Sequence, residues 1–262
     1  MTHFPNIHSE HISVGINTVI EPTASIKGLN GKAHNIVIGD NCYIGSNVQI
    51  IIDEFDIGDY SKVHHHTNIH GYKPCTIGHN AWIGQYTIID SIGGVTIGNN
   101  CGIGAQSQMW SHIKYGDTLE GSRFKSEKEL VIGDDVWLVG HCILSPVSVE
   151  SKSMALVGSV ITSDMKYNRI YGGSPAIDLT DKIGRPFQEV PLPEKIRVMN
   201  QYLQDFSTAP RKLRIIENEA EIKNEDVTYF IVSSRKYTKR NTLEEIAFMN
   251  FLLPEKAKFT PM

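Results

Sequence analysis

The sequence predicts a mainly β solenoid built from three-sided coils, followed by a small α+β unit. Two patterns carry this prediction. Aliphatic residues recur at every sixth position over most of residues 10–180, and they do so in groups of three. A second column, two residues before each aliphatic position, holds small or medium side chains at fifteen of its eighteen positions. A 262-residue chain can bury such a core without disulfides.

The first column is the expected interior of the solenoid. It contains Ile, Leu or Val at sixteen of eighteen positions, and the full set is Ile38, Ile44, Ile50, Ile57, Val63, Ile69, Ile77, Ile83, Ile89, Ile97, Ile103, Met109, Ile132, Leu138, Leu144, Val149, Ala155 and Ile161. All four cysteines, Cys42, Cys75, Cys101 and Cys142, fall in the second column. We therefore interpret them as buried packing residues and not as ligands or nucleophiles.

The grouping in threes predicts the shape of one coil. Spacing within a triplet is six, whereas the steps between triplets are 7, 8, 8, 23 and 5. Three six-residue sides make one triangular coil, and the irregular steps mark the passage to the next coil. Stacked strands lie about 4.8 Å apart, so each aliphatic residue covers its counterpart in the coil below. Val14, Ile20 and Ile26 extend the pattern by one coil.

The pattern changes after Pro175, and we place the boundary between two domains, 1–180 and 181–262. Apolar residues at helical spacing follow Pro193 and predict a helix that ends near Phe206. Residues 212–219 and 226–234 are predicted strands. Residues 242–253 are a predicted helix, with Thr242 and Glu245 spaced as a capping box. The sequence gives no indication of what this second domain does.

Composition and charge argue against two classes of partner, nucleic acid and the membrane interior. The net charge of −4 weighs against nucleic acid as a partner, and no apolar run is long enough for membrane insertion. The first residues, MTHFPNIHSE, lack the layout of a secretory signal, so we expect a cytoplasmic protein.

One long interruption breaks the repeat, and we expect the chemistry there. Residues 110–131 are polar and charged, so they are predicted to leave the stack as an extruded loop. His112 lies where the loop departs from the rigid coils. An imidazole in that position can serve as a general base, because at neutral pH it is largely free to accept a proton. The residues alone leave open the alternative that His112 is a loop histidine without a role.

The segment VIGDDVWLVGHCILSPVSVESKSMALVGSVITSDMKYNRIYGGSPA (131–176) resembles the closing coils of hexapeptide-repeat acyltransferases, which fold as left-handed parallel β-helices. More specifically, it resembles the sugar O-acetyltransferases that modify surface polysaccharides, and their maltose and nodulation-factor relatives. The resemblance implies acetyl-CoA as acyl donor and a sugar or saccharide hydroxyl as acceptor, in surface polysaccharide or lipopolysaccharide biosynthesis. It also implies a homotrimer with active sites between subunits.

The resemblance assigns catalytic roles. Relatives carry their base at the start of the same insert, which favours His112, with Arg123 as the match to an arginine further along it. They also carry a tryptophan in the first repeat after the insert, matched by Trp137. The backbone N–H of Gly140 would then be the oxyanion donor.

The resemblance extends to the two substrates. Relatives often carry an asparagine in the stretch matched by residues 84–90, where this chain has Gln85 and Tyr86 as candidates for acceptor binding. For acetyl-CoA, the matched stretch is Gly158 to Ser163, in which serine replaces the family's lysine. The candidate CoA-binding residues are Gly158, Ser159, Thr162, Lys166 and Arg169.

Other readings of the chain remain open. His79 matches the first zinc ligand of the gamma carbonic anhydrases, but Gly84 stands where the second would be, so we expect no metal in the reaction. One alternative is N-acetylation of a nucleotide-linked amino sugar, which depends less on a histidine base. Another is a non-catalytic β-helix scaffold.

Overall fold

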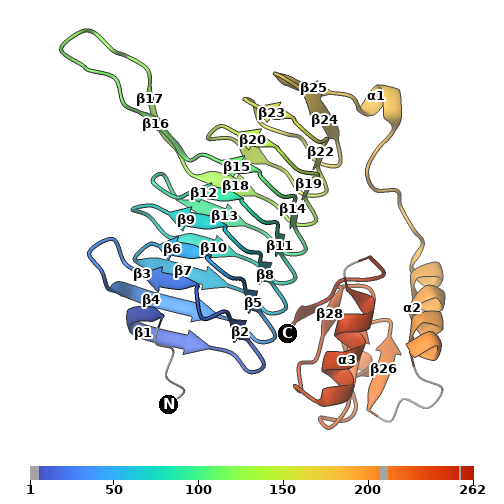
Figure 1. The fold of residues 1–262 in the computed structure, drawn as a ribbon. Coiled ribbons are helices and arrows are strands. Elements are labelled where there is room, and N and C mark those ends of the chain that lie inside the picture. Colours follow the sequence, from blue (N-terminus) through green and yellow to red (C-terminus); the bar gives the residue numbers. More distant parts are fainter. Residues whose placement is uncertain (1–5, 207–211, 254) are drawn as a thin grey trace. The chain divides into compact units, whose positions relative to one another are not determined.

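The computed structural model describes residues 6–206, 212–253 and 255–262 and divides into two compact units, Met1–Phe187 and Gln188–Met262. The first unit is a stack of three-sided coils of short parallel strands, and the second combines helices with a small sheet (Figure 1). The predicted fold class, a hexapeptide-repeat β-helix with a small α+β unit, is confirmed.

The coils have three faces, which we number in chain order. Face 1 contains β4 (Ala33–Ile38), β7 (Glu54–Ile57), β10 (Cys75–Ile77), β13 (Val95–Ile97), β18 (Leu130–Ile132) and β21 (Ser148–Val149). Face 2 contains β2 (Val19–Ile20), β5 (Tyr43–Ile44), β8 (Lys62–Val63), β11 (Trp82–Ile83), β14 (Gly102–Ile103), β19 (Trp137–Leu138), β22 (Met154–Ala155), β24 (Ile170–Gly173) and the antiparallel β25 (Ala176–Asp178).

Face 3 contains β3 (Ser25–Lys27), β6 (Gln49–Ile51), β9 (Asn68–His70), β12 (Ile88–Asp90), β15 (Gln108–Met109), β20 (Ile143–Leu144) and β23 (Val160–Ile161). The first strand, β1 (Ile7–Val14), pairs with β3 and with β4 and so joins faces 3 and 1 at the N-terminal end.

The interior is the predicted aliphatic column. All eighteen predicted positions are buried, none with more than 2% of its surface exposed. The register keeps them stacked, as in the face 2 series Val63, Ile83, Ile103 and Leu138. The four cysteines are free and buried, and burial raises the pKa of the Cys42 and Cys75 thiols to about 12. Such thiols stay protonated, as packing residues do.

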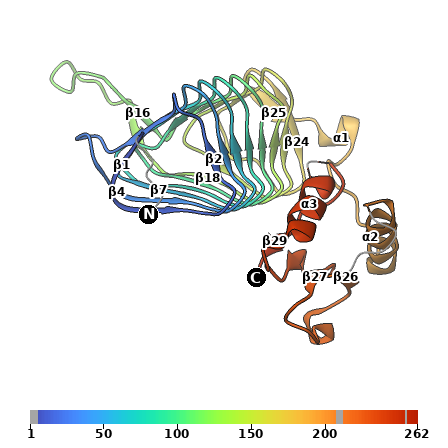
Figure 2. The same ribbon diagram turned by 60° about the horizontal axis from the view of Figure 1, so that its bottom comes forward.

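The predicted extruded loop is a two-stranded hairpin. β16 (His112–Lys114) pairs antiparallel with β17 (Lys125–Glu127), and the hairpin projects from the corner between faces 3 and 1 (Figures 1 and 2). Leu130 and Val131, which we expected in the loop, already belong to face 1. Leu130 is fully buried, because it covers Val95 in the coil below.

The first unit continues past residue 180, where we predicted its end. After β25 comes the short helix α1 (Thr180–Ile183), and Thr180 Oγ1 accepts a hydrogen bond from Ile170 N at 2.9 Å. The side chain of Asn168 then holds the backbone of Phe187 by two hydrogen bonds of 2.9 and 3.0 Å. These contacts keep the segment on the last coil as far as Phe187.

The second unit contains α2 (Leu192–Phe206), β26 (Leu213–Ile216), the 3₁₀ turn Glu219–Glu221, β27 (Thr228–Ile231), β28 (Lys236–Tyr237), α3 (Leu243–Leu252) and β29 (Thr260–Pro261). Thr242 caps α3 by accepting from Glu245 N, as expected. The carboxylate of Glu245, however, accepts from Arg240 N, Asn241 N and Thr228 Oγ1 rather than from the cap residue. None of the described helices is long and apolar enough to cross a membrane.

Candidate active site

The hairpin is anchored at its base by Ser111, which is fully buried. Its hydroxyl accepts from Gly93 N at 2.8 Å, and its carbonyl accepts from Lys128 N at 3.1 Å, so one residue holds both ends of the hairpin to the stack. His112 is the next residue, and its backbone position is therefore set by the coil below.

A buried carboxylate lies directly beneath this base. Asp90 ends β12, one coil before the hairpin, and has no exposed surface. Its Oδ1 accepts hydrogen bonds from His112 Nδ1 at 2.7 Å, from Ser111 Oγ at 3.0 Å and from Ser111 N at 3.2 Å. Burial alone would raise the pKa of Asp90, but its contacts with His70, His112 and Ser111 outweigh burial and hold that pKa at about 2.

The ionised carboxylate fixes the tautomer of His112. A carboxylate can only accept, so Nδ1 of His112 carries a proton, and in the neutral ring Nε2 is then the acceptor. The side chain is 20% exposed, which leaves a path for a second reactant. A histidine oriented in this way through Nδ1 is the arrangement that general-base catalysis uses.

A second histidine faces the same carboxylate from below. His70 Nε2 lies 3.4 Å from Asp90 Oδ2, an ion-pair contact without hydrogen-bond geometry. Its Nδ1 lies 2.7 Å from Asn68 Oδ1, and Asn68 Nδ2 donates to Gln49 Oε1, which sets the orientation of the Asn68 amide. Both ring nitrogens of His70 thus face oxygen atoms, one of Asn68 and one of Asp90.

Asp90, Ser111 and His70 were not among the predicted catalytic or binding residues. The signal was present in the repeat: His70 and Asp90 each follow an inward isoleucine, Ile69 and Ile89, at one corner of successive coils. A histidine and an aspartate stacked below the departure point of the insert indicate a charged cluster there.

The remaining predicted catalytic residues lie at another part of the same chain. Trp137 is in face 2, 52% exposed, and its ring lies so close to Gly102 that a Cβ there would come within 3.3 Å of Trp137 Cδ1. Gly140 follows at the corner between faces 2 and 3, with a φ of +146°, and its carbonyl accepts from Gly158 N at 3.0 Å. One chain therefore does not bring the base and the predicted oxyanion donor together.

The predicted acceptor-binding residues are similarly divided. Gln85 and Tyr86 form the corner between faces 2 and 3, where Tyr86 is half exposed and stacks on His66 with ring centroids 4.9 Å apart. Arg123 is exposed in the hairpin on the other side of face 3.

The predicted CoA-binding residues occupy the last coils. Gly158 has a φ of +74°, and Thr162 is exposed. Ser159 is buried, and its hydroxyl donates to Leu156 O. The two cations are both paired: Lys166 Nζ lies 3.2 Å from Glu150, and Arg169 lies 3.4 Å from Asp178. A phosphate would have to compete with these carboxylates.

Comparisons with known proteins agree with the fold. No protein-family model matches the chain. It is 33% identical over 115 residues to the bifunctional protein GlmU of Anaplasma marginale (strain Florida), a match that covers 42% of this chain and 24% of that protein. It is 39% identical over 83 residues to the galactoside O-acetyltransferase of Escherichia coli (strain K12), which covers 30% of this chain and 37% of that enzyme. The matched segments thus span about a quarter to over a third of these curated relatives.

Among solved structures, a single-residue mutant of AntD, an N-acyltransferase from Bacillus cereus, aligns with a TM-score of 0.49 at 18% identity, covering 76% of this chain and 92% of that one. The six-residue repeat and the three-sided stack define a hexapeptide-repeat β-helix protein. The predicted resemblance to the hexapeptide-repeat acyltransferases is confirmed.

Proposed function

We propose that this protein is an acetyl-CoA-dependent O-acetyltransferase that acts on a sugar hydroxyl, with His112 as general base. The observation that carries the proposal is the 2.7 Å hydrogen bond from His112 Nδ1 to the buried carboxylate of Asp90. It leaves Nε2 as a base at the one place where the repeat opens. The resemblance to acyltransferases supplies the acyl donor.

The proposed reaction uses this geometry. The acceptor hydroxyl gives its proton to His112 Nε2 while its oxygen attacks the carbonyl carbon of the thioester. The imidazolium that forms is stabilised by Asp90, to which its Nδ1–H already donates. When the tetrahedral intermediate collapses, the carbon–sulfur bond breaks, and His112 returns the proton to the CoA thiolate. The products are the acetyl ester and CoA.

The same proposal requires more than one copy of the chain. Gly140, the candidate oxyanion donor, and Trp137 lie away from His112 in one chain, so a neighbouring copy would supply them. The hairpin favours such a partner, because Tyr115, Leu119 and Phe124 are 102%, 95% and 89% exposed. Large apolar side chains so fully in solvent are what a covering subunit would bury. We propose a homotrimer, in line with the resemblance.

We also propose the setting of the reaction. A soluble thioester donor and a saccharide acceptor would suit an enzyme of the cytoplasm that takes part in surface polysaccharide or lipopolysaccharide biosynthesis. Lys166 and Arg169 remain the candidates for the CoA phosphates, provided that phosphate displaces Glu150 and Asp178 from them.

The test is a mass-spectrometric screen for acetyl transfer from acetyl-CoA to pools of sugars and nucleotide sugars, run with wild type and His112→Ala. We expect an acetylated hydroxyl with wild type and its loss with the variant. Acetylation of an amino sugar that survives in His112→Ala would instead favour an N-acetyltransferase. Isothermal titration without any acetyl-CoA binding would leave only the scaffold.

A further inference from the structure

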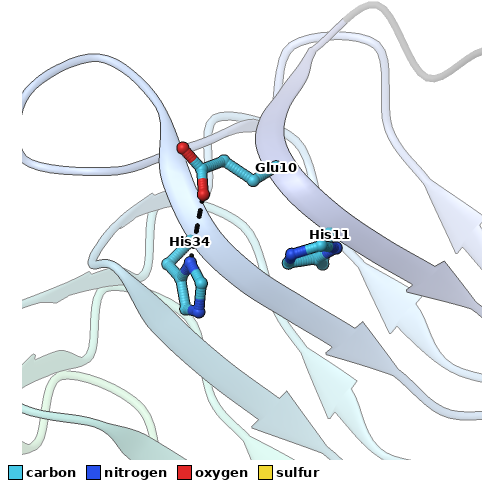
Figure 3. A group of neighbouring side chains, drawn as sticks. All are labelled: Glu10, His11 and His34. Atoms are coloured by element: carbon cyan, nitrogen blue, oxygen red, sulfur yellow. Dashed lines mark hydrogen bonds and ion pairs between the residues drawn. The ribbon is translucent and has the colours of Figure 1, made fainter.

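A second cluster of metal-binding side chain types lies at the N-terminal end of the solenoid. Glu10, His11 and His34 each offer one ligand atom, and the three atoms all lie within 4.8 Å of one another. Figure 3 shows the three side chains gathered on neighbouring strands. No other group of this kind occurs among the residues that the structure describes.

The pairing of β1 with β4 creates this cluster. Ser9 lies opposite Ala33 and His11 opposite Asn35, so Glu10 and His34 occupy the positions between these pairs. Paired strands are about 4.8 Å apart, which brings their side chains within reach of a shared ion. All three side chains are exposed, so an ion can enter from solvent without any movement of the backbone.

We propose that Glu10, His11 and His34 bind a divalent transition-metal ion of the zinc type, which joins β1 to β4. Two imidazoles and one carboxylate are ligands that zinc prefers, at 2.0–2.2 Å, so neighbouring ligand atoms in a tetrahedral site lie about 3.4 Å apart. Glu10 Oε2 and His34 Nδ1 are already 3.1 Å apart. Magnesium and calcium favour six or more oxygen ligands, which this cluster does not offer.

The arrangement of the two rings supports this site. The rings of His11 and His34 meet edge to face, with centroids 5.5 Å apart. His11 offers the third ligand atom, and because its side chain is exposed, it is free to rotate toward an ion held by Glu10 and His34.

Local charge sets the conditions for binding. The hydrogen bond from His34, and then the nearby Lys32, hold the pKa of Glu10 below its ordinary value, so the carboxylate is ionised and available. The imidazoles bind a metal ion through a ring-nitrogen lone pair, and Lys32 is the nearby positive charge that opposes the ion.

The expected consequence is structural. β1 begins the stack and pairs with both β3 and β4, so an ion that joins β1 to β4 secures the first coil. An ion that binds only the folded state raises the unfolding temperature with its concentration. The site is separate from the proposed base: β7, β10 and β13 lie between β4 and β18, which is roughly 19 Å of stacked strands.

The test is a calorimetric titration of the full chain with Zn²⁺, supported by the visible absorption of bound Co²⁺. We expect one ion per chain in wild type and at least a tenfold weaker affinity in His34→Ala and in His11→Ala. Glu10→Gln should also weaken binding, because it removes the negative ligand. Zn²⁺ should raise the unfolding temperature of wild type but not of His34→Ala.

Two matched controls are available. His8→Ala removes an exposed histidine from the same strand, and His66→Ala removes one from a different histidine cluster; both should bind as wild type does. Unfolding without metal, followed by circular dichroism, verifies that each variant is folded. Absence of Zn²⁺ binding, unchanged affinity in His34→Ala, or loss of binding in His66→Ala would overturn the proposal. Acetyl transfer by the same variants reports separately on the proposed function.

Discussion

Two histidines at two corners of the same solenoid are held in opposite tautomers. At the corner between faces 1 and 2, His79 Nδ1 accepts a hydrogen bond from the backbone N–H of Asp59 at 2.9 Å, so its proton is on Nε2. At the corner between faces 3 and 1, His112 Nδ1 donates to Asp90 at 2.7 Å, and its Nε2 is the acceptor. In both cases the hydrogen-bond partner of Nδ1 decides the tautomer.

The partners explain the difference. The corner between faces 1 and 2 is a ladder in which each side chain accepts a backbone N–H from the previous coil. Its successive acceptors are Asp40, Asp59, His79, Asn99, Asp134 and Ser151. His79 therefore accepts a backbone hydrogen bond that other residue types accept equally well at the same corner of other coils. The ring of His112 instead donates to a buried carboxylate, which orients it.

Of the substitutions that test this comparison, His112→Ala should have the largest effect on kcat. Removal of a general base lowers kcat by about 10²–10⁴-fold, and it also takes one donor from the buried Asp90 carboxylate, so some stability should be lost with it. His79→Ala is the matched control: it should keep kcat and lose stability. Steady-state kinetics and thermal unfolding of both variants measure this. A His112→Ala enzyme with near wild-type kcat would contradict the assignment of the base.

Asp90→Asn should have the next largest effect. An amide in place of the carboxylate no longer fixes the proton on Nδ1 of His112 and no longer stabilises the imidazolium, so kcat should fall at least about tenfold. The substitution preserves size, so the effect should appear in kcat more than in KM. If kcat is unchanged, Asp90 does not orient the base.

Asp90 also predicts a pH dependence of stability. Its pKa is about 2 in the folded protein against an ordinary 3.8, so it stabilises the fold above about pH 4 and loses this contribution as pH falls toward 2. The loss amounts to about 2 kcal/mol. Urea unfolding between pH 6 and 2 should show it in wild type, and its absence in Asp90→Asn is the control.

His70→Ala should lower kcat less, about three- to tenfold. His70 contacts the Asp90 carboxylate that orients His112, and its contact is the largest of those that lower the pKa of Asp90. Without it the pKa of Asp90 should rise, so the acid loss of stability due to Asp90 should be complete at a higher pH. A merely structural role would lower activity without moving that pH, and His70→Lys, which retains a donor, should restore part of the shift.

The sequence predicts the fold far better than the site. The stack depends on a period that repeats eighteen times, so each aliphatic position supports the others, and all are buried as predicted. The site depends on single residues. His112 could be predicted because the insert interrupts the period. Asp90 and His70 lie within regular coils, and their contacts join residues about twenty positions apart in the sequence.

Lys166 and Arg169 are residues that the sequence did select, but whose partners it did not predict. Their positive charge matched the need of a phosphate ligand, but the structure pairs them with Glu150 and Asp178, partners that arrive from neighbouring turns of the chain. Glu245 is similar, since its capping role was predicted from spacing while the backbone groups it accepts from lie before the cap residue. Spacing predicts which types of residue meet, but packing decides which atoms do.

The smallest predicted effect concerns the ladder residue. His79→Asn places an amide oxygen where Asn99 carries one in the next coil, and that oxygen accepts His79 N–H at 2.9 Å. His79→Asn should therefore keep the hydrogen bond from Asp59 N–H and unfold within about 0.5 kcal/mol of wild type, whereas His79→Ala should lose about 1 kcal/mol. Urea unfolding of the two variants decides between them. Equal losses would mean that the imidazole itself, through packing or a second contact, and not its acceptor atom, is what this corner requires.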